Sequence, residues 1–136
     1  MSALTHFFFR SPELSRRTTW DVVAWWESRR PVYNVAVGAT GLVSLATVKL
    51  FLALPPHPVE NVIPLGAVVA WGLLANGFYT TGWLAELGMR RWLGDEVAPA
   101  GAALFRYGFV FSIGLTLFPA MVSALSWVAR LTSIFR

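Results

Sequence analysis

The chain has 136 residues, which is enough for one small domain, and 56% of them are hydrophobic whereas only 13% are charged. A soluble globular domain has roughly 25% charged residues, so this composition is typical of a membrane protein. In a soluble protein the net charge of +4 would suggest nucleic acid; here the arginines flank apolar segments, which favours contact with lipid headgroups. The absence of cysteine excludes disulfides, thiolate metal sites and covalent haem attachment.

Residues 1–31 are predicted to form a cytoplasmic tail and a short amphipathic helix. Ser11 before Pro12, and Thr18 three residues before Asp21, are both typical of helix starts. From residue 19 to 30, apolar side chains form one broad side and charged side chains the other. About 12 residues are too few to cross a bilayer, so we expect this helix to lie in the interface plane.

Residues 32–136 are predicted to form a domain of three transmembrane helices. The apolar segments at 32–54, 62–84 and 102–128 each reach the roughly 20 residues that a span needs. The sequence PPHP at 55–58 ends the first span, and the glycines and prolines of residues 94–101 separate the second from the third. The third span is long and contains Pro119, so a tilt or a kink is expected there. The expected fold class is an all-α membrane protein with three transmembrane helices preceded by an interfacial helix.

The distribution of basic residues predicts the orientation. Eight arginines precede the first span or border the second loop, whereas three basic residues lie on the other side. The positive-inside rule therefore predicts a cytoplasmic N-terminus and a periplasmic C-terminus. The two groups are Arg10, Arg16, Arg17, Arg29, Arg30, Arg90, Arg91 and Arg106 against Lys49, Arg130 and Arg136.

The two histidines are the first candidates for a cofactor or metal site. His6 lies in the N-terminal tail and His57 in the proline-rich turn, so neither is inside a predicted span. Neither has a partner at the spacing of a metal site. We therefore expect no cofactor bound through the chain's own ligands and no metal, and leave peripheral contacts with lipid or pigment open.

The second predicted span has the most polar side chains. Asn76, Thr80, Trp83 and Leu87 share one helix face. A buried asparagine needs a hydrogen-bonding partner, because an unpaired amide in hydrocarbon costs several kcal/mol. Such a face serves a substrate or proton path, or it holds helices together; we favour the second interpretation.

Glu86 is expected at the cytoplasmic edge, at the depth of several arginines. Ionisable residues within a membrane are functional candidates, and a proton relay is one interpretation. Side chains at span ends also reach water, and we favour an ion-pair clasp that joins the three helices. No nucleophile–base pair or phosphate-binding loop is present, so no catalytic residue is predicted. The predicted clasp comprises Arg29, Arg30, Asn34, Asn76, Tyr79, Glu86 and Arg106.

Tryptophans are concentrated near the predicted cytoplasmic interface, as in an aromatic belt. Three helices cannot enclose so many large rings, so some rings must face lipid or other chains. The predicted interfacial anchors are Trp20, Trp25, Trp26, Trp83 and Trp92.

Small residues recur at four-residue spacing on two of the predicted spans. They include Ala36, Thr40 and Ser44 on the first span and Gly108 and Ser112 on the third. Such faces allow close helix packing, either within the chain or with a partner.

Two motifs carry a resemblance. The pattern WWExRRxxYN spans residues 25–34, and N-x-x-Y-x-x-x-W-x-x-E spans residues 76–86. Together they resemble small uncharacterised bacterial inner-membrane proteins over roughly the first two spans. This resemblance implies that the protein is located in the bacterial inner membrane, which is either the cytoplasmic membrane or an intracytoplasmic one. It implies no enzymatic or transport activity.

These observations favour a non-catalytic accessory subunit of a large bacterial energy-transducing membrane complex. A photosynthetic reaction centre–light-harvesting assembly is the first choice, in which the protein stabilises contacts between larger subunits, lipids and pigments; no nucleic-acid partner is expected. A respiratory-complex subunit is the alternative. The alternative from another class is a small transporter or membrane enzyme that uses Asn76, Tyr79 and Glu86.

Overall fold

The computed structural model describes residues 7–8, 18–56, 58, 60, 63–94 and 100–132. Within these ranges all regular structure is helical, which confirms the predicted all-α class. The long elements in chain order are α2 (Thr19–Glu27), α3 (Arg30–Ala53), α4 (Leu65–Leu93) and α5 (Ala100–Thr132).

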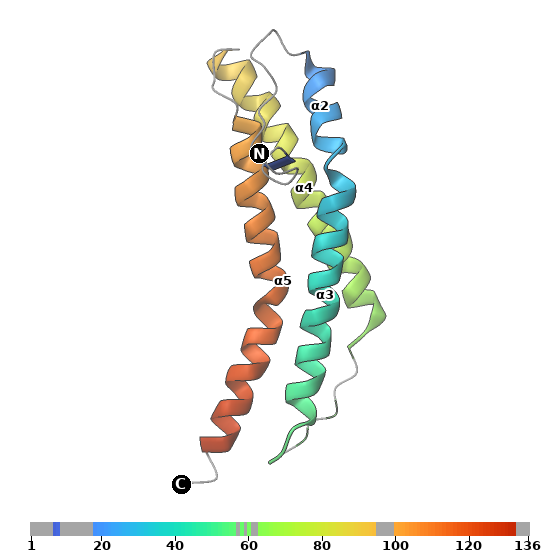
Figure 1. Cartoon of the computed structure of the whole chain (residues 1–136), viewed down its shortest axis with the longest axis vertical. Coiled ribbons are helices and arrows are strands. Elements are labelled where there is room, and N and C mark those ends of the chain that lie inside the picture. The colour runs from blue at the N-terminus through green and yellow to red at the C-terminus, as the bar shows by residue number, and fades with distance from the viewer. Residues whose placement is uncertain are drawn as a thin grey trace.

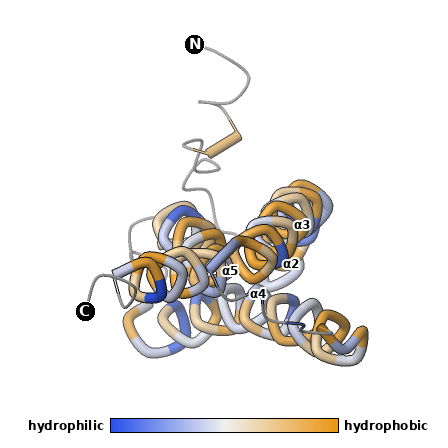
Figure 2. The backbone as a smooth tube through the Cα atoms, turned by 90° about the horizontal axis from the view of Figure 1, so that it is seen from below, coloured by the Kyte–Doolittle hydropathy of each residue, from blue (hydrophilic) through white to orange (hydrophobic). Residues whose placement is uncertain are grey.

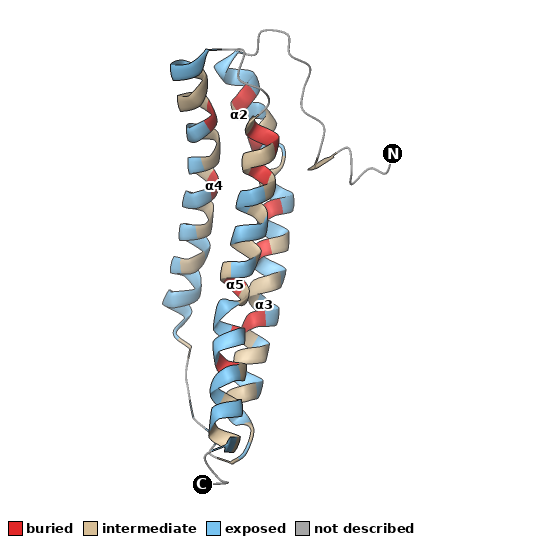
Figure 3. Cartoon of the chain, turned by 90° about the vertical axis from the view of Figure 1, so that its left-hand side faces the viewer, coloured by how far each residue is buried: buried red, intermediate tan, exposed pale blue. Residues whose placement is uncertain are grey.

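The three longer helices run alternately up and down. α3 and α5 lie side by side over most of their length, whereas α4 approaches them at one end and diverges toward the other (Figure 1; Figure 3). The start of α3, the end of α4 and the start of α5 therefore meet at one end of the molecule, together with α2. Arg29, Arg30, Arg90 and Arg91 belong to this end, and Lys49 and Arg130 lie toward the opposite end.

The helix ends follow local sequence signals. Thr18 caps α2: its backbone N–H donates to the Asp21 carboxylate at 2.8 Å, and the Asp21 N–H donates to the Thr18 hydroxyl at 3.3 Å. α3 ends at Ala53, two residues before Pro55, and α4 ends at Leu93 before Gly94, whose φ of 81° favours glycine. These boundaries confirm the predicted breaks at Pro55 and Gly94, whereas Gly101, predicted as a further breaker, lies inside α5. Pro99 and the predicted helix start at Ser11 lie outside the described residues.

Helix α2 is present where a short helix was predicted. Residues 28 and 29 form a turn, after which α3 begins at Arg30 and continues in roughly the direction of α2 (Figure 1). Val22 and Trp26 of α2 are only 0% and 2% exposed, so this helix contributes to the core. The prediction that it lies flat in a membrane interface is not confirmed.

Two helical segments in the described ranges have the length and composition to cross a membrane, Thr19–Ala53 and Ala100–Thr132. α4 is a helix at the predicted second span but is not one of these two, so its crossing stays a prediction. Only 11% and 17% of the most apolar windows of the two segments are buried. The reason is that hydrophobic residues occur all round the helices, on outer faces as well as inner ones (Figure 2).

The interior has two parts of different chemistry. The aromatic core at the α2 end contains Val22, Trp26, Tyr33, Val37, Tyr79 and Phe105. Farther along, small residues line the seam between α3 and α5: Ser44 and Thr116 are each 4% exposed, and a Cβ on Gly41 would lie 3.8 Å from the Thr116 methyl group. The small face of α3 is thus used within the chain, as close helix packing requires.

Enlarging a residue in the seam should push α3 and α5 apart. We expect Ser44→Leu to destabilise the fold by about 1–3 kcal/mol, because extra atoms in a packed interior force side chains and backbone to shift. Thermal unfolding of the purified protein in detergent measures the effect. Gly38→Leu is the control, since nothing lies within 4 Å of a Cβ at that position of the same helix. Equal unfolding midpoints for the two variants would contradict the proposed packing.

Candidate functional site

The most deeply buried charged group is in the aromatic end of the molecule. Among the described residues with buried polar side chains, Glu86 is the one with a formal charge, and it is 2% exposed. The Trp26 indole N–H donates to Glu86 Oε2 at 2.7 Å, and the Arg90 guanidinium donates to Oε1 at 3.1 Å. Glu86 thereby links α2 to α4 through a charge-assisted hydrogen bond, and it forms an ion pair with Arg90 one turn along α4.

The Glu86 carboxylate also lies against the first turn of α5. A Cβ on Gly101 would be 2.7 Å from Glu86 Cδ, so only a glycine leaves room for the carboxylate there. The N-terminal turn of a helix has unpaired backbone N–H groups and a partial positive charge, which favours a nearby carboxylate. We call Trp26, Glu86, Arg90 and Gly101 the Glu86 junction; it joins α2, α4 and α5.

Trp26 occupies the centre of the aromatic core. Its ring centroid is 5.4 Å from that of Tyr79 and 5.9 Å from that of Phe105, both in edge-to-face geometry. The Tyr79 hydroxyl donates a short hydrogen bond to the Trp26 backbone carbonyl. Gly82 makes room for the indole, since a Cβ there would lie 2.6 Å from Trp26 Cη2. The neighbouring rings, the hydrogen bonds and the space left by Gly82 fix the position of this side chain.

Arg30 forms the second polar group at this end, next to Tyr79. Its guanidinium makes two 2.7 Å contacts with Glu27. It also donates to Asn76 Oδ1 at 3.3 Å and to the Thr80 hydroxyl at 3.2 Å, and lies 4.8 Å from the centroid of the Tyr79 ring. Arg30 thus connects the start of α3 to the polar face of α4 that the sequence analysis singled out.

Arg29 contacts aromatic residues and backbone. Its guanidinium lies 3.8 Å from the Trp25 ring centroid and 5.0 Å from that of Phe7. It donates to the Trp25 carbonyl at 3.0 Å and to the Phe7 carbonyl at 3.2 Å. These contacts hold Phe7 against α2, and Phe7 and Phe8 both pack on Phe105.

The structure brings together part of the predicted clasp. Arg30, Asn76 and Tyr79 lie in contact as described above, and Glu86 lies on the same helix as the latter two. The described partners of Glu86, however, are Trp26 and Arg90, neither of which the prediction assigned to it. The other three members lie apart from these contacts: Arg29 packs on Trp25 and Phe7, Asn34 is exposed on α3, and Arg106 is half-buried near the start of α5.

The predicted anchors fall into two groups. Trp20 and Trp92 are 78% and 87% exposed, in the manner of side chains that reach into an interface. Trp25 and Trp83 are partly buried against the core, and Trp26 is buried. The prediction that Trp26 anchors the chain in lipid headgroups is therefore wrong, because its indole N–H is used for a hydrogen bond to Glu86. The four-residue spacing of Val22 and Trp26 was the sequence signal for this buried face.

Several participants were not predicted. The sequence predicts for Arg90 only a part in the orientation, for Gly101 only a break in the chain, and for Gly82 nothing. In the structure Arg90 pairs with Glu86, and the two glycines leave space for Trp26 and Glu86. Trp83 Nε1 is buried without a hydrogen-bond partner. Within the described ranges no group of three His, Asp or Glu residues is placed to hold a metal ion, and both histidines lie outside those ranges.

Comparisons with known protein families, with curated proteins and with solved structures find no match to this chain. The role of the site is therefore inferred from its geometry alone. The hydrogen-bonding groups of the Glu86 junction and of the Arg30 guanidinium contact other parts of the same chain, and several of these contacts join helices.

A double-mutant cycle on Trp26→Phe and Glu86→Leu, which each remove one partner of the hydrogen bond, should reveal coupling between the two side chains. We expect a coupling energy of about 1.5–3 kcal/mol, the range for a hydrogen bond to a charged group. The free energies of unfolding of the wild type, both single variants and the double variant provide the measurement. Additive effects within experimental error would contradict the junction.

Substitution of Gly82 by alanine should separate packing at the junction from helix propensity. Gly82→Ala should destabilise the fold by about 1–3 kcal/mol, because the rigid Trp26 ring must move. Gly88→Ala, in the same helix with nothing within 4 Å of its Cβ position, should stabilise it by about 0.5–1 kcal/mol. We expect the unfolding midpoint to fall in Gly82→Ala and to rise in Gly88→Ala. A shift in the same direction in both variants would contradict the described position of Trp26.

Proposed function

We propose that this protein is a multi-pass protein of the bacterial inner membrane and a non-catalytic accessory subunit of a larger energy-transducing complex. One observation carries the proposal: the described polar groups of the interior are largely bonded within the chain, whereas many large apolar side chains outside the aromatic core face outward. The core helix of a soluble protein would be mostly buried, but the apolar windows of the two candidate spans are 11% and 17% buried. Such a surface favours lipid or neighbouring chains as its surroundings.

In this proposal α3, α4 and α5 each cross the membrane. At 1.5 Å per residue the 33 residues of α5 extend about 50 Å, longer than the roughly 30 Å of hydrocarbon. The extra length places the Glu86 junction and the arginines of that end near the headgroups. By the positive-inside rule this end is cytoplasmic, and the C-terminus is periplasmic.

For the partner we propose first a photosynthetic reaction centre–light-harvesting assembly, and second a respiratory complex. Neither histidine lies in α2–α5, so these helices offer aromatic and aliphatic surface rather than histidine ligands to a neighbour's pigment or haem. Exposed rings such as those of Phe78, Tyr107 and Phe111 suit contacts with larger subunits, lipids and pigments.

A small transporter or membrane enzyme remains the alternative, because a buried carboxylate inside a membrane protein is a functional candidate. The contacts of its three residues argue against it. Glu86 is bonded to Trp26 and Arg90, and the Tyr79 hydroxyl donates to a backbone carbonyl. Asn76 accepts from Arg30 and donates to the Gly72 carbonyl at 3.1 Å.

Affinity purification of the tagged chain from its native membranes, in mild detergent, tests the proposal. We expect stoichiometric co-purification with larger subunits, and an absorption spectrum of the eluate that shows bacteriochlorophyll-type pigment for a photosynthetic complex or haem for a respiratory one. Stability measurements on the same samples identify variants that are simply unfolded.

The opposite outcome is equally specific. A chain that purifies alone, and that shows transport or turnover abolished by Glu86→Gln while the protein stays folded, would overturn the accessory role in favour of the alternative.

A further inference from the structure

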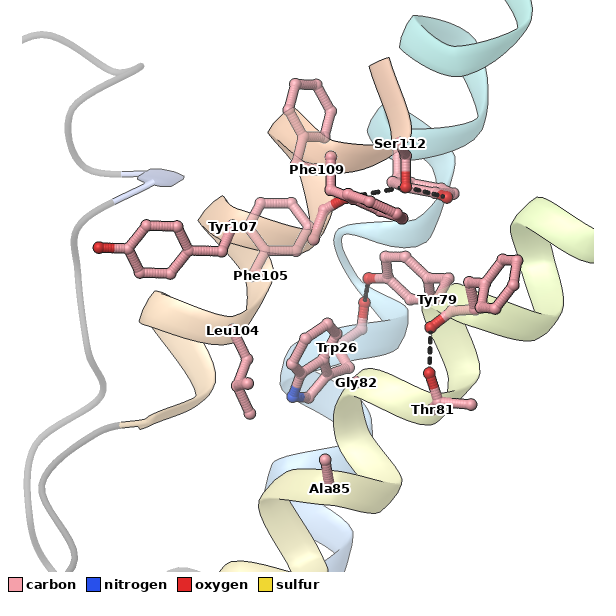
Figure 4. A pocket seen from close by; sticks show the side chains of 14 residues that line it. Trp26, Tyr79, Thr81, Gly82, Ala85, Leu104, Phe105, Tyr107, Phe109 and Ser112 are labelled. Carbon is pink, nitrogen blue, oxygen red and sulfur yellow. Dashed lines mark hydrogen bonds between the residues drawn. The ribbon is translucent and has the colours of Figure 1, made fainter. Parts of the chain in front are cut away.

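A pocket of about 290 Å³ lies between α4 and α5 (Figure 4). α4 lines one side with Phe78, Gly82 and Ala85, and α5 lines the other with residues 104, 107, 108 and 111. Both sets follow the i, i+3, i+4, i+7 spacing of a single helix face. Trp26, Tyr33 and Phe105 also contribute to the lining.

The polar groups of the lining are already paired. The Tyr33 hydroxyl lies 3.0 Å from that of Ser112, which donates to the Gly108 carbonyl at 2.8 Å. The Thr81 hydroxyl donates to the backbone of its own helix at 2.6 Å, and the hydroxyl of Tyr107 points away from the pocket (Figure 4). The two remaining polar side chains are Trp26 and Tyr79, whose hydrogen bonds are described above. An occupant is therefore offered mainly van der Waals and hydrophobic contact, which selects hydrocarbon.

The size of the pocket restricts the shape of that occupant. An apolar cavity of roughly 150 Å³ holds one benzene molecule, so 290 Å³ accommodates about twice that amount of hydrocarbon. A single turn of helix, about 10 Å across and 5.4 Å tall, already fills roughly 400 Å³. A narrow chain therefore fits the pocket, and a transmembrane helix does not.

The pocket opens toward the outer surface of α4 and α5. Its rim residues Phe78 and Phe111 are 56% and 64% exposed, and the neighbouring Leu74 and Val110 are exposed as well. In the membrane placement proposed above, on which this inference rests, that surface faces lipid tails. We propose that the pocket binds one acyl chain of a membrane phospholipid.

Two glycines of α5 provide a matched pair of test variants. Nothing lies within 4 Å of a Cβ at either Gly108 or Gly114, so a side chain can begin at both positions without a clash. Gly108 lines the pocket and Gly114 does not. Gly108→Leu should occupy the space of the acyl chain, whereas Gly114→Leu adds the same side chain to the same helix outside the pocket.

The experiment uses the full chain in phosphatidylcholine vesicles doped with a phosphatidylcholine that carries a photoactivatable diazirine in one acyl chain. After irradiation, mass spectrometry locates the labelled peptides. We expect label concentrated on the segments around Phe78 and Phe111, a several-fold loss of that label in Gly108→Leu, and no loss in Gly114→Leu.

The outcomes separate this inference from the proposed function. Insertion into vesicles with label spread evenly over the apolar surface, or with equal labelling in both variants, would refute the acyl-chain site alone. Covalent dimers linked through the pocket in place of lipid adducts would assign it to a second copy and likewise refute the proposal. Failure of the wild-type chain to insert, assayed by flotation, would refute the membrane placement and the lipid site together.

Discussion

Burial of the Glu86 carboxylate is the constraint on which the arrangement of the helices depends. Removing a charge from water costs several kcal/mol even after relaxation of the protein, and the cost must be offset by good hydrogen bonds and an opposite charge. Trp26 from α2 and Arg90 from the next turn of α4 supply both, and the carboxylate also lies against the first turn of α5. If one of these helices moved away, the charge would lose a partner, so the junction fixes their relative positions.

This requirement accounts for neighbouring features that otherwise have no common cause. The indole reaches Glu86 only if it passes over α4 at Gly82, and the carboxylate fits beside α5 only at Gly101. The Trp26 backbone carbonyl is held by Tyr79. Away from the junction no comparable charge is buried in the described residues, and small residues such as Ser44 and Thr116 let α3 and α5 pack directly. α4 reaches this stretch through Trp71, whose indole N–H donates to the Thr116 hydroxyl at 3.4 Å.

Local features of the fold were predictable from the sequence, because their causes lie within a few residues. The capping box at Thr18, the end of α3 before Pro55 and the end of α4 at Gly94 depend on backbone geometry that the neighbouring residues determine. The polar face that begins at Asn76 was recognised from helical spacing, and Arg30 does bind it.

The junction was not predictable in the same way, because its partners are far apart in the chain. Trp26 and Glu86 are separated by 60 positions, and a tryptophan beside arginines at a helix end equally suits a lipid-facing anchor. The composition of this segment does not distinguish a lipid-facing anchor from a buried hydrogen-bond donor. The burial of Trp26 and the close approaches at Gly82 and Gly101 show that Trp26 has the buried role. For the same reason, sequence could place Glu86 near positive charge without identifying Arg90 as its partner.

The exchange of tryptophan indole protons with solvent tests the central claim most directly, because the chain contains its own references. NMR of the ¹⁵N-labelled protein, with each indole assigned by substitution, should show slow exchange of the Trp26 Nε1 proton and fast exchange for Trp20 and Trp92, which are 78% and 87% exposed. Glu86→Gln should shift the Trp26 resonance more than any other indole. A Trp26 proton that exchanges as fast as those two references, or that does not respond to Glu86→Gln, would contradict the account.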